Sequence, residues 1–282
     1  MEKIILYYKF LPITDPTSVM FWQRALGEKL GLKGRILISK HGINGTLGGD
    51  LKALKAYKRT MQEHPSFRDI TYKWSDGTGR DFPKLVVKVR DEIVTFGAGD
   101  ELCVDEGGVV GGGQHLKPEE VHRLVEERGD DVIFYDGRNL YEASIGKFKN
   151  TIVPNVRKAT DFLEDIESGE IAQHKDRPIV TYCTGGIRCE ILSSLMKNRG
   201  YKEVYQMDGG IVKYGEAYGD EGLWDGKLFV FDNRMSIGFS DKAKDIASCA
   251  ECGQPTSRMI NSENVRRQLT LQCEDCATAQ VA

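Results

Sequence analysis

The sequence has no long hydrophobic run. Its longest strongly apolar stretch near the start, Ile4–Tyr8, is five residues long, whereas a membrane-spanning helix needs about 20 apolar residues. The same stretch lies between Glu2 and Lys9 and is too short for the apolar region of a signal peptide. We therefore expect a cytoplasmic protein that does not associate with a membrane.

The composition excludes several further classes. With 40% hydrophobic and 29% charged residues, the chain is neither collagen-like, nor disordered, nor a small disulfide scaffold. Its 282 residues predict about two domains, because one domain usually takes roughly 100–200 residues. The sequence also has no histidine-rich metal site, flavin motif or nicotinamide-type G-x-G-x-x-G loop, so it shows no site for a redox cofactor.

Cysteines are scarce, and their number, seven, is odd. In a reducing compartment, such a set indicates catalysis or metal binding rather than disulfides. Cys103 stands alone, and we expect it to be a small buried thiol. The remaining cysteines gather at two places, which are residues 183–189 and residues 249–276.

Charge is distributed unevenly along the chain. Residues 1–99 carry 17 Lys and Arg against 10 Asp and Glu, a balance of +7, whereas residues 100–282 carry 22 against 32, a balance of −10. The basic part either binds a polyanion or docks onto the acidic remainder, and the charge pattern alone favours neither.

One predicted helix, Leu51–Glu63, concentrates part of this positive charge. Its periodicity places Lys52, Lys55 and Arg59 opposite an apolar side, so these three residues are candidate phosphate contacts. Tyr57 lies among the basic residues and is either a base-stacking aromatic or a core residue.

The first third of the chain has the pattern of a ferredoxin-like domain. Asp15-Pro16 predicts a helix start, and that helix runs to about Leu30. The predicted strands are Ile4–Phe10, Arg35–Ser39, Thr46–Leu47, Ile70–Trp74 and Leu85–Val89, with a turn at His41–Gly45. Together with Leu51–Glu63, these elements have the β-α-β-β-α-β order of the split βαβ motif.

After a glycine-dense connector at residues 107–113, strands and helices alternate. Short apolar strands are predicted at Val132–Tyr135, Ile179–Tyr182 and Val204–Gln206, and helices from Pro118, at Arg157–Ile166 and at Ile191–Arg199. This alternation indicates a parallel sheet with helices on both faces. Ligands bind beyond the carboxyl ends of such strands, where Asp136 and Cys183 are expected.

Cys183 has the strongest chemical signal in the sequence. It ends a buried strand and is followed by Thr184, Gly185, Gly186 and Ile187, a short loop whose backbone N–H groups can surround an anion. The positive end of a helix and the charge of Arg188 also favour a thiolate. Cys183 is therefore a candidate nucleophile. Cys189 is expected to face the following helix and to tolerate replacement by Ala far better than Cys183 does.

The segment Cys-Thr-Gly-Gly-Ile-Arg resembles the active-site loop of rhodanese domains, in which a cysteine persulfide lies in a cradle of N–H groups. Related phosphatases use a loop one residue longer, so the resemblance argues against a phosphatase. Asp136-Gly-Arg138 matches the rhodanese segment that follows the first buried strand, and the resemblance implies a supporting role for both residues. Glu142 and Glu190 are further supporting candidates.

The similarity extends over nearly the whole chain. Segments 34–39, 42–46, 88–97, 145–148 and 229–232, taken in order, are similar to the rhodanese-domain tRNA uridine hydroxylases. The resemblance implies a ferredoxin-like domain at 1–99, a linker and rhodanese domain at 100–225, and a cysteine-bearing tail at 226–282. It also implies hydroxylation of the wobble uridine of tRNA to 5-hydroxyuridine, with molecular oxygen as co-substrate, an unidentified electron donor and no DNA partner. His41 departs from the acidic residue usual in that family.

The tail contains the spacing of a four-cysteine zinc ribbon. Cys249-x-x-Cys252 and Cys273-x-x-Cys276 are separated by twenty residues. Four thiolates around a tetrahedral zinc ion would form a closed, structural site. Iron, or reduced thiols without metal, are the alternatives.

Two other functions use the same residues. A sulfurtransferase that carries a persulfide on Cys183 would need neither RNA nor the tail, and a binding module would leave the loop idle. If the protein is a hydroxylase, Cys183 either adds to C6 of uracil or acts as a persulfide or sulfenic species. The residues do not choose between these routes.

Overall fold

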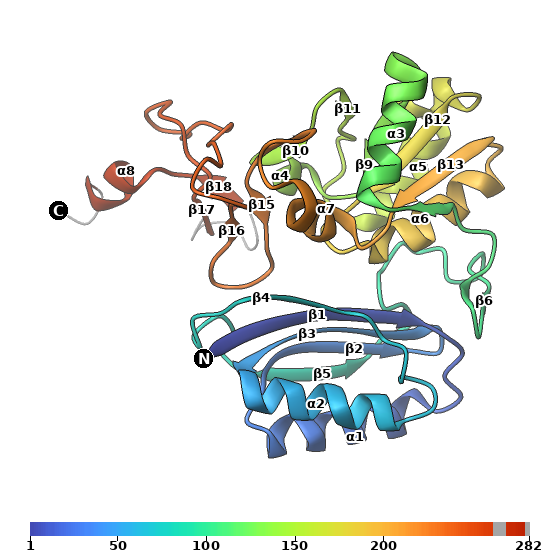
Figure 1. The fold of residues 1–282 in the computed structure, drawn as a ribbon, viewed down its shortest axis with the longest axis vertical. Coiled ribbons are helices and arrows are strands. Elements are labelled where there is room, and N and C mark those ends of the chain that lie inside the picture. The colour runs from blue at the N-terminus through green and yellow to red at the C-terminus, as the bar shows by residue number, and fades with distance from the viewer. Residues whose placement is uncertain (262–268, 280–282) are drawn as a thin grey trace. The chain divides into compact units, whose positions relative to one another are not determined.

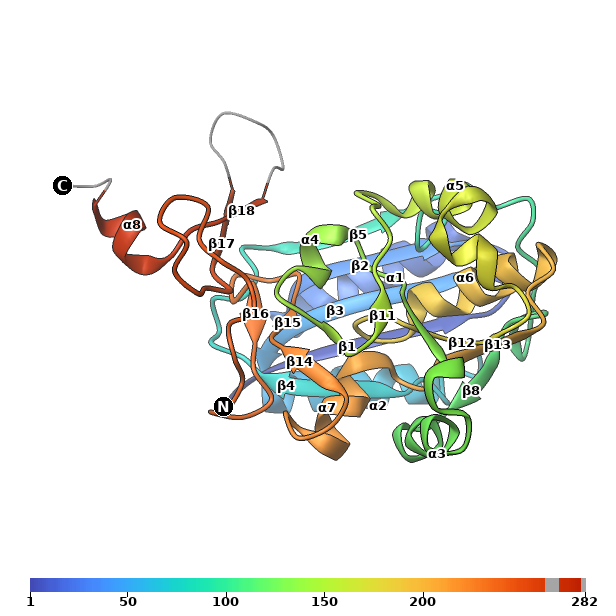
Figure 2. The ribbon, with the colours of Figure 1, turned by 90° about the horizontal axis from the view of Figure 1, so that it is seen from above.

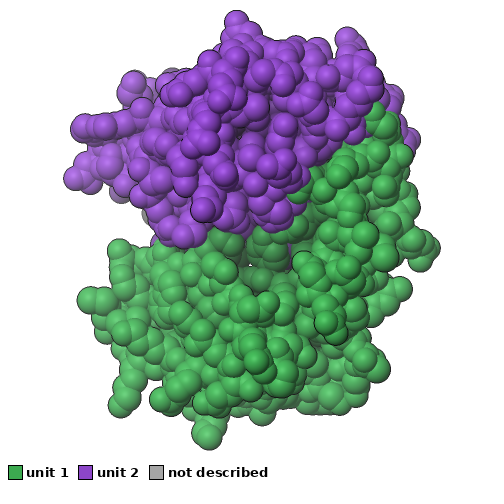
Figure 3. Space-filling view, turned by 45° about the vertical axis from the view of Figure 1, so that its right-hand side comes forward, with its two compact units in different colours: residues 1–113, 190–200 green, residues 114–189, 201–282 purple. Residues whose placement is uncertain are grey.

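The computed structural model describes residues 1–261 and 269–279. It divides into two compact units, residues 1–113 with 190–200 and residues 114–189 with 201–282, which Figure 3 colours separately. The boundaries of the three predicted domains stay a prediction. Of the predicted tail 226–282, residues 262–268 and 280–282 lie outside the described residues. Within the described residues, no helix combines the length and apolar character that a membrane crossing needs.

The first unit is built on a five-stranded sheet in the order β4-β1-β3-β2-β5. Its strands are β1 (Glu2–Phe10), β2 (Lys33–Ser39), β3 (Gly42–Asp50), β4 (Tyr72–Asp76) and β5 (Leu85–Val89). Helices α1 (Pro16–Lys29) and α2 (Leu51–Glu63) cover one face of this sheet (Figure 1). The predicted ferredoxin-like domain is therefore confirmed, and β5 pairs in parallel with β2 at its edge.

The core of this unit forms where α2 meets the sheet. Leu54, Tyr57 and Met61 are fully buried and belong to one cluster with strand residues such as Ile5 and Ile36. Burying an aromatic side chain contributes about 1.5–3 kcal/mol. Tyr57 is therefore a core residue and not a surface for base stacking.

The turn predicted at His41–Gly45 is confirmed at His41 but wrong for residues 42–45, because the turn consists of Lys40 and His41 and β3 already begins at Gly42. A Cβ atom on Gly45 would lie 2.3 Å from Cζ of Tyr7, whose ring packs across this strand. The glycines thus allow β1 and its tyrosine to lie close to β3. Glycine in a local sequence pattern indicates a turn, but Gly45 is needed here for a contact with a residue far away in the sequence.

The glycine-dense connector contains a small hairpin of β6 (Val104–Asp105) and β7 (Gly108–Val109). It is bonded to helix α6 (Ile187–Asn198), since the Gly113 N–H donates to Ser193 Oγ at 2.8 Å and Lys197 Nζ donates to the Gly112 carbonyl at 3.1 Å. Cys103 is exposed, so the prediction that it is buried is wrong.

The second unit contains a five-stranded sheet in the order β11-β9-β12-β13-β8, in which all neighbours are parallel. Its strands are β8 (Gln114–Leu116), β9 (Ile133–Asp136), β11 (Thr151–Ile152), β12 (Pro178–Tyr182) and β13 (Glu203–Met207). Helices α3 (Pro118–Arg128) and α7 (Gly210–Tyr218) lie on one face and α5 (Phe162–Ser168) lies on the other (Figure 2). The predicted parallel sheet with helices on both faces is confirmed.

The helix predicted at Arg157–Ile166 is shorter than expected. Residues Ala159–Asp161 form the 3₁₀ turn η2, and α5 begins only at Phe162. The Asp161 carboxylate accepts a hydrogen bond from the N–H of Arg157 at 3.1 Å. This side-chain bond favours a tight turn over residues 157–161 instead of a first turn of α-helix.

Short elements complete the second unit. They are η1 (Gly129–Asp131), α4 (Leu140–Ala143), β10 (Gly146–Phe148), η3 (Glu170–His174), β14 (Trp224–Gly226), β15 (Leu228–Phe229), β16 (Ser236–Ile237), β17 (Met259–Asn261), β18 (Leu269–Leu271) and α8 (Glu274–Ala279). Antiparallel pairs join β10 to β14, β15 to β16 and β17 to β18. Of these elements, β17, β18 and α8 belong to the cysteine-bearing tail.

Candidate active site and metal centre

The Cys183 loop lies at the carboxyl end of β12, as predicted. All five residues of β12 are buried, and Cys183 follows directly. The Gly186 N–H donates to the Cys183 sulfur at 3.2 Å, and α6 begins at the next residue. Gly186 has φ = 96°, a conformation that glycine adopts without strain.

The start of α7 holds this loop in place. The N–H groups of Ile211 and Val212 donate to the carbonyls of Cys183 and Thr184 at 2.9 and 3.1 Å. A Cβ atom on Gly210 would lie 2.4 Å from the Cys183 carbonyl oxygen, so only glycine fits at this approach. The loop is therefore fixed by the fold before any ligand binds.

The surroundings of Cys183 favour its thiolate. Burial raises the pKa of Cys183, but a hydrogen bond from the Cys189 thiol, the charge of Arg188 and the N–H groups of Arg188 and Cys189 lower it to about 5. Burial and the neighbouring Cys183 together raise the pKa of Cys189 well above its usual value. At neutral pH the loop thus contains a thiolate at Cys183 beside a thiol at Cys189.

Cys189 lies in a different place from the one predicted. It is the third residue of α6 rather than a residue facing that helix, and its side chain is fully buried. Its backbone N–H donates to the carbonyl of Gly186, whose own N–H donates to the Cys183 sulfur.

Arg188 is engaged by a carboxylate that the sequence pattern did not pair with it. Its guanidinium donates two hydrogen bonds to Glu142, at 2.6 and 2.8 Å, and one to Thr184 Oγ1 at 3.4 Å. The Glu142 side chain is fully buried, and that of Arg188 is 11% exposed. Burial lowers the pKa of Arg188, but Glu142 more than offsets this effect, so the guanidinium stays charged.

The two supporting residues at the end of β9, Asp136 and Arg138, form a second buried ion pair. Arg138 donates to both carboxylate oxygens of Asp136, at 2.9 and 2.6 Å, and to the Gly146 carbonyl at 2.7 Å. The Tyr182 hydroxyl, from the strand that leads to the loop, also donates to Asp136 at 2.8 Å. This network joins β9, β10 and β12 next to the site.

The remaining predicted support, Glu190, bonds within the first compact unit, where it accepts a hydrogen bond from the Tyr8 hydroxyl at 3.0 Å. Sequence reasoning missed Phe231. The Arg188 guanidinium lies over its ring, 5.9 Å from the centroid, although half of the Phe231 side chain is exposed. The recurrence of the segment 229–232 was the signal that could have found it.

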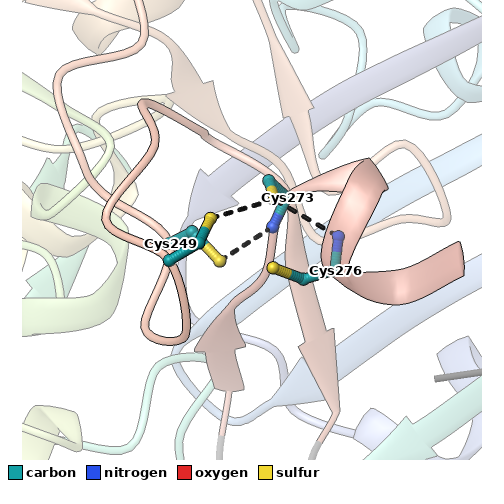
Figure 4. A group of neighbouring side chains, drawn as sticks. Cys249, Cys273 and Cys276 are labelled. Atoms are coloured by element: carbon teal, nitrogen blue, oxygen red, sulfur yellow. Dashed lines mark hydrogen bonds between the residues drawn. The ribbon is translucent and has the colours of Figure 1, made fainter. Parts of the chain in front are cut away.

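The four tail cysteines converge as their spacing predicted. Their sulfur atoms all lie within 4.8 Å of one another. Cys249 accepts the N–H of Cys273 at 3.3 Å, and Cys273 accepts the N–H of Cys276, which belongs to α8, at 3.5 Å (Figure 4). A tetrahedral zinc ion with Zn–S bonds of about 2.3 Å would place its sulfur atoms about 3.8 Å apart. The cluster therefore fits a metal ion after small side-chain adjustments.

Backbone N–H groups prepare one of these cysteines for metal binding. The N–H groups of Cys273, Cys252 and Glu251 lower the pKa of Cys249 to about 6. The thiolate is the form that binds metals. Gly253, with φ = 76°, donates its N–H to the Cys249 carbonyl at 3.0 Å and closes the turn that presents the first cysteine pair.

The three candidate phosphate contacts share one surface of the first unit. Lys52, Lys55 and Arg59 are exposed and line a shallow hollow of about 560 Å³. Asp50 and the N-terminal residue Met1 line the same hollow.

The fold and site define a class of protein, which is a rhodanese-type domain combined with an acylphosphatase-like domain and a cysteine cluster. Family models agree with this description. A UPF0176 acylphosphatase like domain matches residues 2–93, a Rhodanese-like domain matches residues 117–217, and a Rhodanase C-terminal region matches residues 225–282.

Three curated relatives carry the same name, "tRNA uridine(34) hydroxylase". The protein of Corynebacterium diphtheriae is 62% identical over 98% of this chain and 90% of its own length. That of Corynebacterium jeikeium is 64% identical over 98% and 89%, and that of an Arthrobacter species is 61% identical over 99% and 95%. The chain belongs to the tRNA uridine(34) hydroxylase family.

Proposed function

We propose that this protein is a cytoplasmic enzyme that converts uridine 34 of tRNA to 5-hydroxyuridine with molecular oxygen. The observation that carries the proposal is the Cys183 loop, a fixed cradle whose buried sulfur is a thiolate at neutral pH. The name of relatives about 60% identical over nearly the whole chain supports the choice of substrate.

A thiolate is the form needed for addition to C6 of uracil. Addition there makes C5 electron-rich, and C5 can then react with oxygen. This route needs a nucleophile that is ionised near pH 7, and the low pKa of Cys183 meets that requirement. A persulfide or sulfenic species on Cys183 is the alternative route.

The neighbouring residues act on Cys183 in different ways. Arg188 supplies positive charge, and the N–H groups of Gly186, Arg188 and Cys189 hold the sulfur. Glu142 orients Arg188 through two hydrogen bonds. Asp136 and Arg138 are positioning residues that fix the strand ends around the loop.

The two other parts serve binding and stability. Lys52, Lys55 and Arg59 bind tRNA phosphates, because three exposed cations on one helix face offer affinity without base recognition. The four tail cysteines bind a structural zinc ion, which stabilises a region that has little apolar core of its own.

The proposal is tested by nucleoside analysis of tRNA from a strain that lacks the gene. We expect 5-hydroxyuridine to be absent, to return with the wild-type protein, and to stay absent with Cys183→Ala. A gel shift with tRNA tests binding. If the purified protein transferred sulfur to cyanide but never produced 5-hydroxyuridine, the sulfurtransferase alternative would replace the proposal.

A further inference from the structure

The loop contains two thiols, and the chemistry above uses only one. Cys183 and Cys189 are both fully buried, and Gly186 ties the two residues together, because its N–H donates to the Cys183 sulfur at 3.2 Å and its carbonyl accepts the Cys189 N–H. The position of Cys189 is fixed, since its N–H donates to the Gly186 carbonyl at 3.0 Å in the first turn of α6. A second cysteine held against a nucleophilic thiolate is the arrangement from which a disulfide forms.

The proposed reaction has an electron requirement that this pair meets. Molecular oxygen takes up four electrons when one atom enters the C5–OH group and the other becomes water. Oxidation of the C5–H bond supplies two of these electrons, and a further donor must supply the other two. Oxidation of two thiols to a disulfide releases two electrons and two protons.

We propose that Cys183 and Cys189 together are the immediate electron donor of the hydroxylation, each turnover converting this dithiol to a disulfide. The inference rests on the proposed function. In the overall step, uridine, oxygen and the two thiols give 5-hydroxyuridine, water and the disulfide. The C5–H, O–O and Cys189 S–H bonds break, and solvent returns the proton that the Cys183 thiolate had already lost. A C5–O bond, a C5-hydroxyl O–H bond, two O–H bonds of water and an S–S bond form.

The arrangement of the two sulfurs assigns them different tasks. Cys183, the thiolate, adds to C6, and oxygen then joins C5 as a peroxide. Cys189, which still has its proton, gives that proton to the peroxide and takes the distal oxygen on its sulfur. When Cys183 leaves C6 as the C5 proton is lost, its sulfur displaces this oxygen from Cys189 as hydroxide, which becomes water on protonation. A cellular or added dithiol then reduces the disulfide and is itself oxidised.

The other cysteines are placed less well for this task. Cys103 is exposed on the connector hairpin of the first unit, and the remaining four sulfurs form the tail cluster. The pair 183–189 is also simple to identify. Trypsin cleaves after Arg188, so a Cys183–Cys189 disulfide joins the two peptides 176–188 and 189–197.

The first test is a reaction without external reductant. The full-length protein is reduced, freed of reductant under nitrogen, and mixed with tRNA and air. We expect about one 5-hydroxyuridine per chain, together with an equal amount of the 176–188/189–197 disulfide seen by mass spectrometry. Addition of dithiothreitol should restart turnover. Many turnovers per chain without reductant, or product without this disulfide, would overturn the inference while leaving the proposed function intact.

The second test compares Cys189→Ala with Cys103→Ala, a matched removal of an exposed thiol. Without reductant, Cys189→Ala should lose at least about tenfold of the product formed per chain, and Cys103→Ala should lose none. With excess dithiothreitol, Cys189→Ala should regain product, because the added thiol replaces the missing one. This rescue excludes a folding defect. Equal product from Cys189→Ala and wild type without reductant would contradict the inference.

A different outcome is expected if the proposed function itself is wrong. The wild-type protein would then make no 5-hydroxyuridine even with dithiothreitol and air. The donor role would then be refuted as well. Product in the presence of reductant separates the two failures, because it establishes the hydroxylation independently of its electron source.

Discussion

The reactivity of Cys183 depends on groups that act on a single sulfur atom. Because its pKa is lowered to about 5, its thiolate fraction is nearly constant between pH 6 and 8. An ordinary cysteine with a pKa of about 8.5 becomes roughly tenfold more ionised per pH unit over the same range. We expect alkylation of Cys183 by iodoacetamide, followed by peptide mass spectrometry, to be flat from pH 6 to 8 and to fall below pH 5.

Free cysteine added to the same sample serves as the control, because its alkylation should rise with pH over this range. A Cys183 rate that rises tenfold per pH unit to pH 8 would show a thiol with an ordinary pKa. It would also remove the physical basis for its role as the nucleophile.

The ion pair of Glu142 and Arg188 should contribute to the stability of the folded protein. Glu142→Gln leaves Arg188 charged in a nearly closed site without its carboxylate partner. Breaking a buried ion pair in this way costs about 3 kcal/mol, and urea denaturation should show this loss. The exposed pair Glu221–Lys242 offers the control, since Glu221→Gln should leave the urea midpoint unchanged. Equal midpoints for wild type and Glu142→Gln would show that the buried pair is not stabilising.

The elements that the sequence predicted well are those with local causes. The bounds of α2 follow from an apolar period and an Asp50 cap, and the Cys183 loop follows from a contiguous motif. The partners of these elements were not predictable in this way. Glu142 precedes Arg188 by 46 residues, and no local pattern indicates that the two side chains meet. Gly45 was assigned to a turn for the same reason. A side chain is excluded at this position by the ring of Tyr7, which lies on another strand.

The tail makes a prediction at the level of the β17–β18 hairpin and α8. The four converging cysteines should bind about one zinc ion per chain, because four thiolates complete one tetrahedral shell. Cys249→Ser should lose the metal and make the tail sensitive to proteolysis, whereas Cys103→Ser should retain it. Elemental analysis of freshly reduced protein measures this directly. Absence of zinc and iron from the wild type would refute a metal site.

At the scale of the whole molecule, charge is distributed unevenly between the first third of the chain and the remainder. The basic balance of +7 lies in residues 1–99, whereas residues 100–282, which contain the Cys183 loop, have a balance of −10. A segment of net negative charge repels a polyanion, so our proposal assigns the electrostatic affinity for tRNA to the basic part. The sequence pattern concentrates part of this positive charge on the exposed side of α2, at Lys52, Lys55 and Arg59.

Reversing Lys52, Lys55 and Arg59 to Glu tests this division of roles. Each lost phosphate contact should lower the slope of log K against log salt by about one unit, so the triple variant should lose about three units and bind tRNA far more weakly. Lys202, Lys213 and Lys242 are exposed in the second unit, and their reversal to Glu makes the same change in net charge. This control should keep most of the affinity and the full slope. Alkylation of Cys183 should be unchanged in both variants, because the loop is built from residues of the second unit. If the α2 variant kept the affinity and slope of wild type, the three residues would be an ordinary solvated surface, and tRNA would have to bind elsewhere.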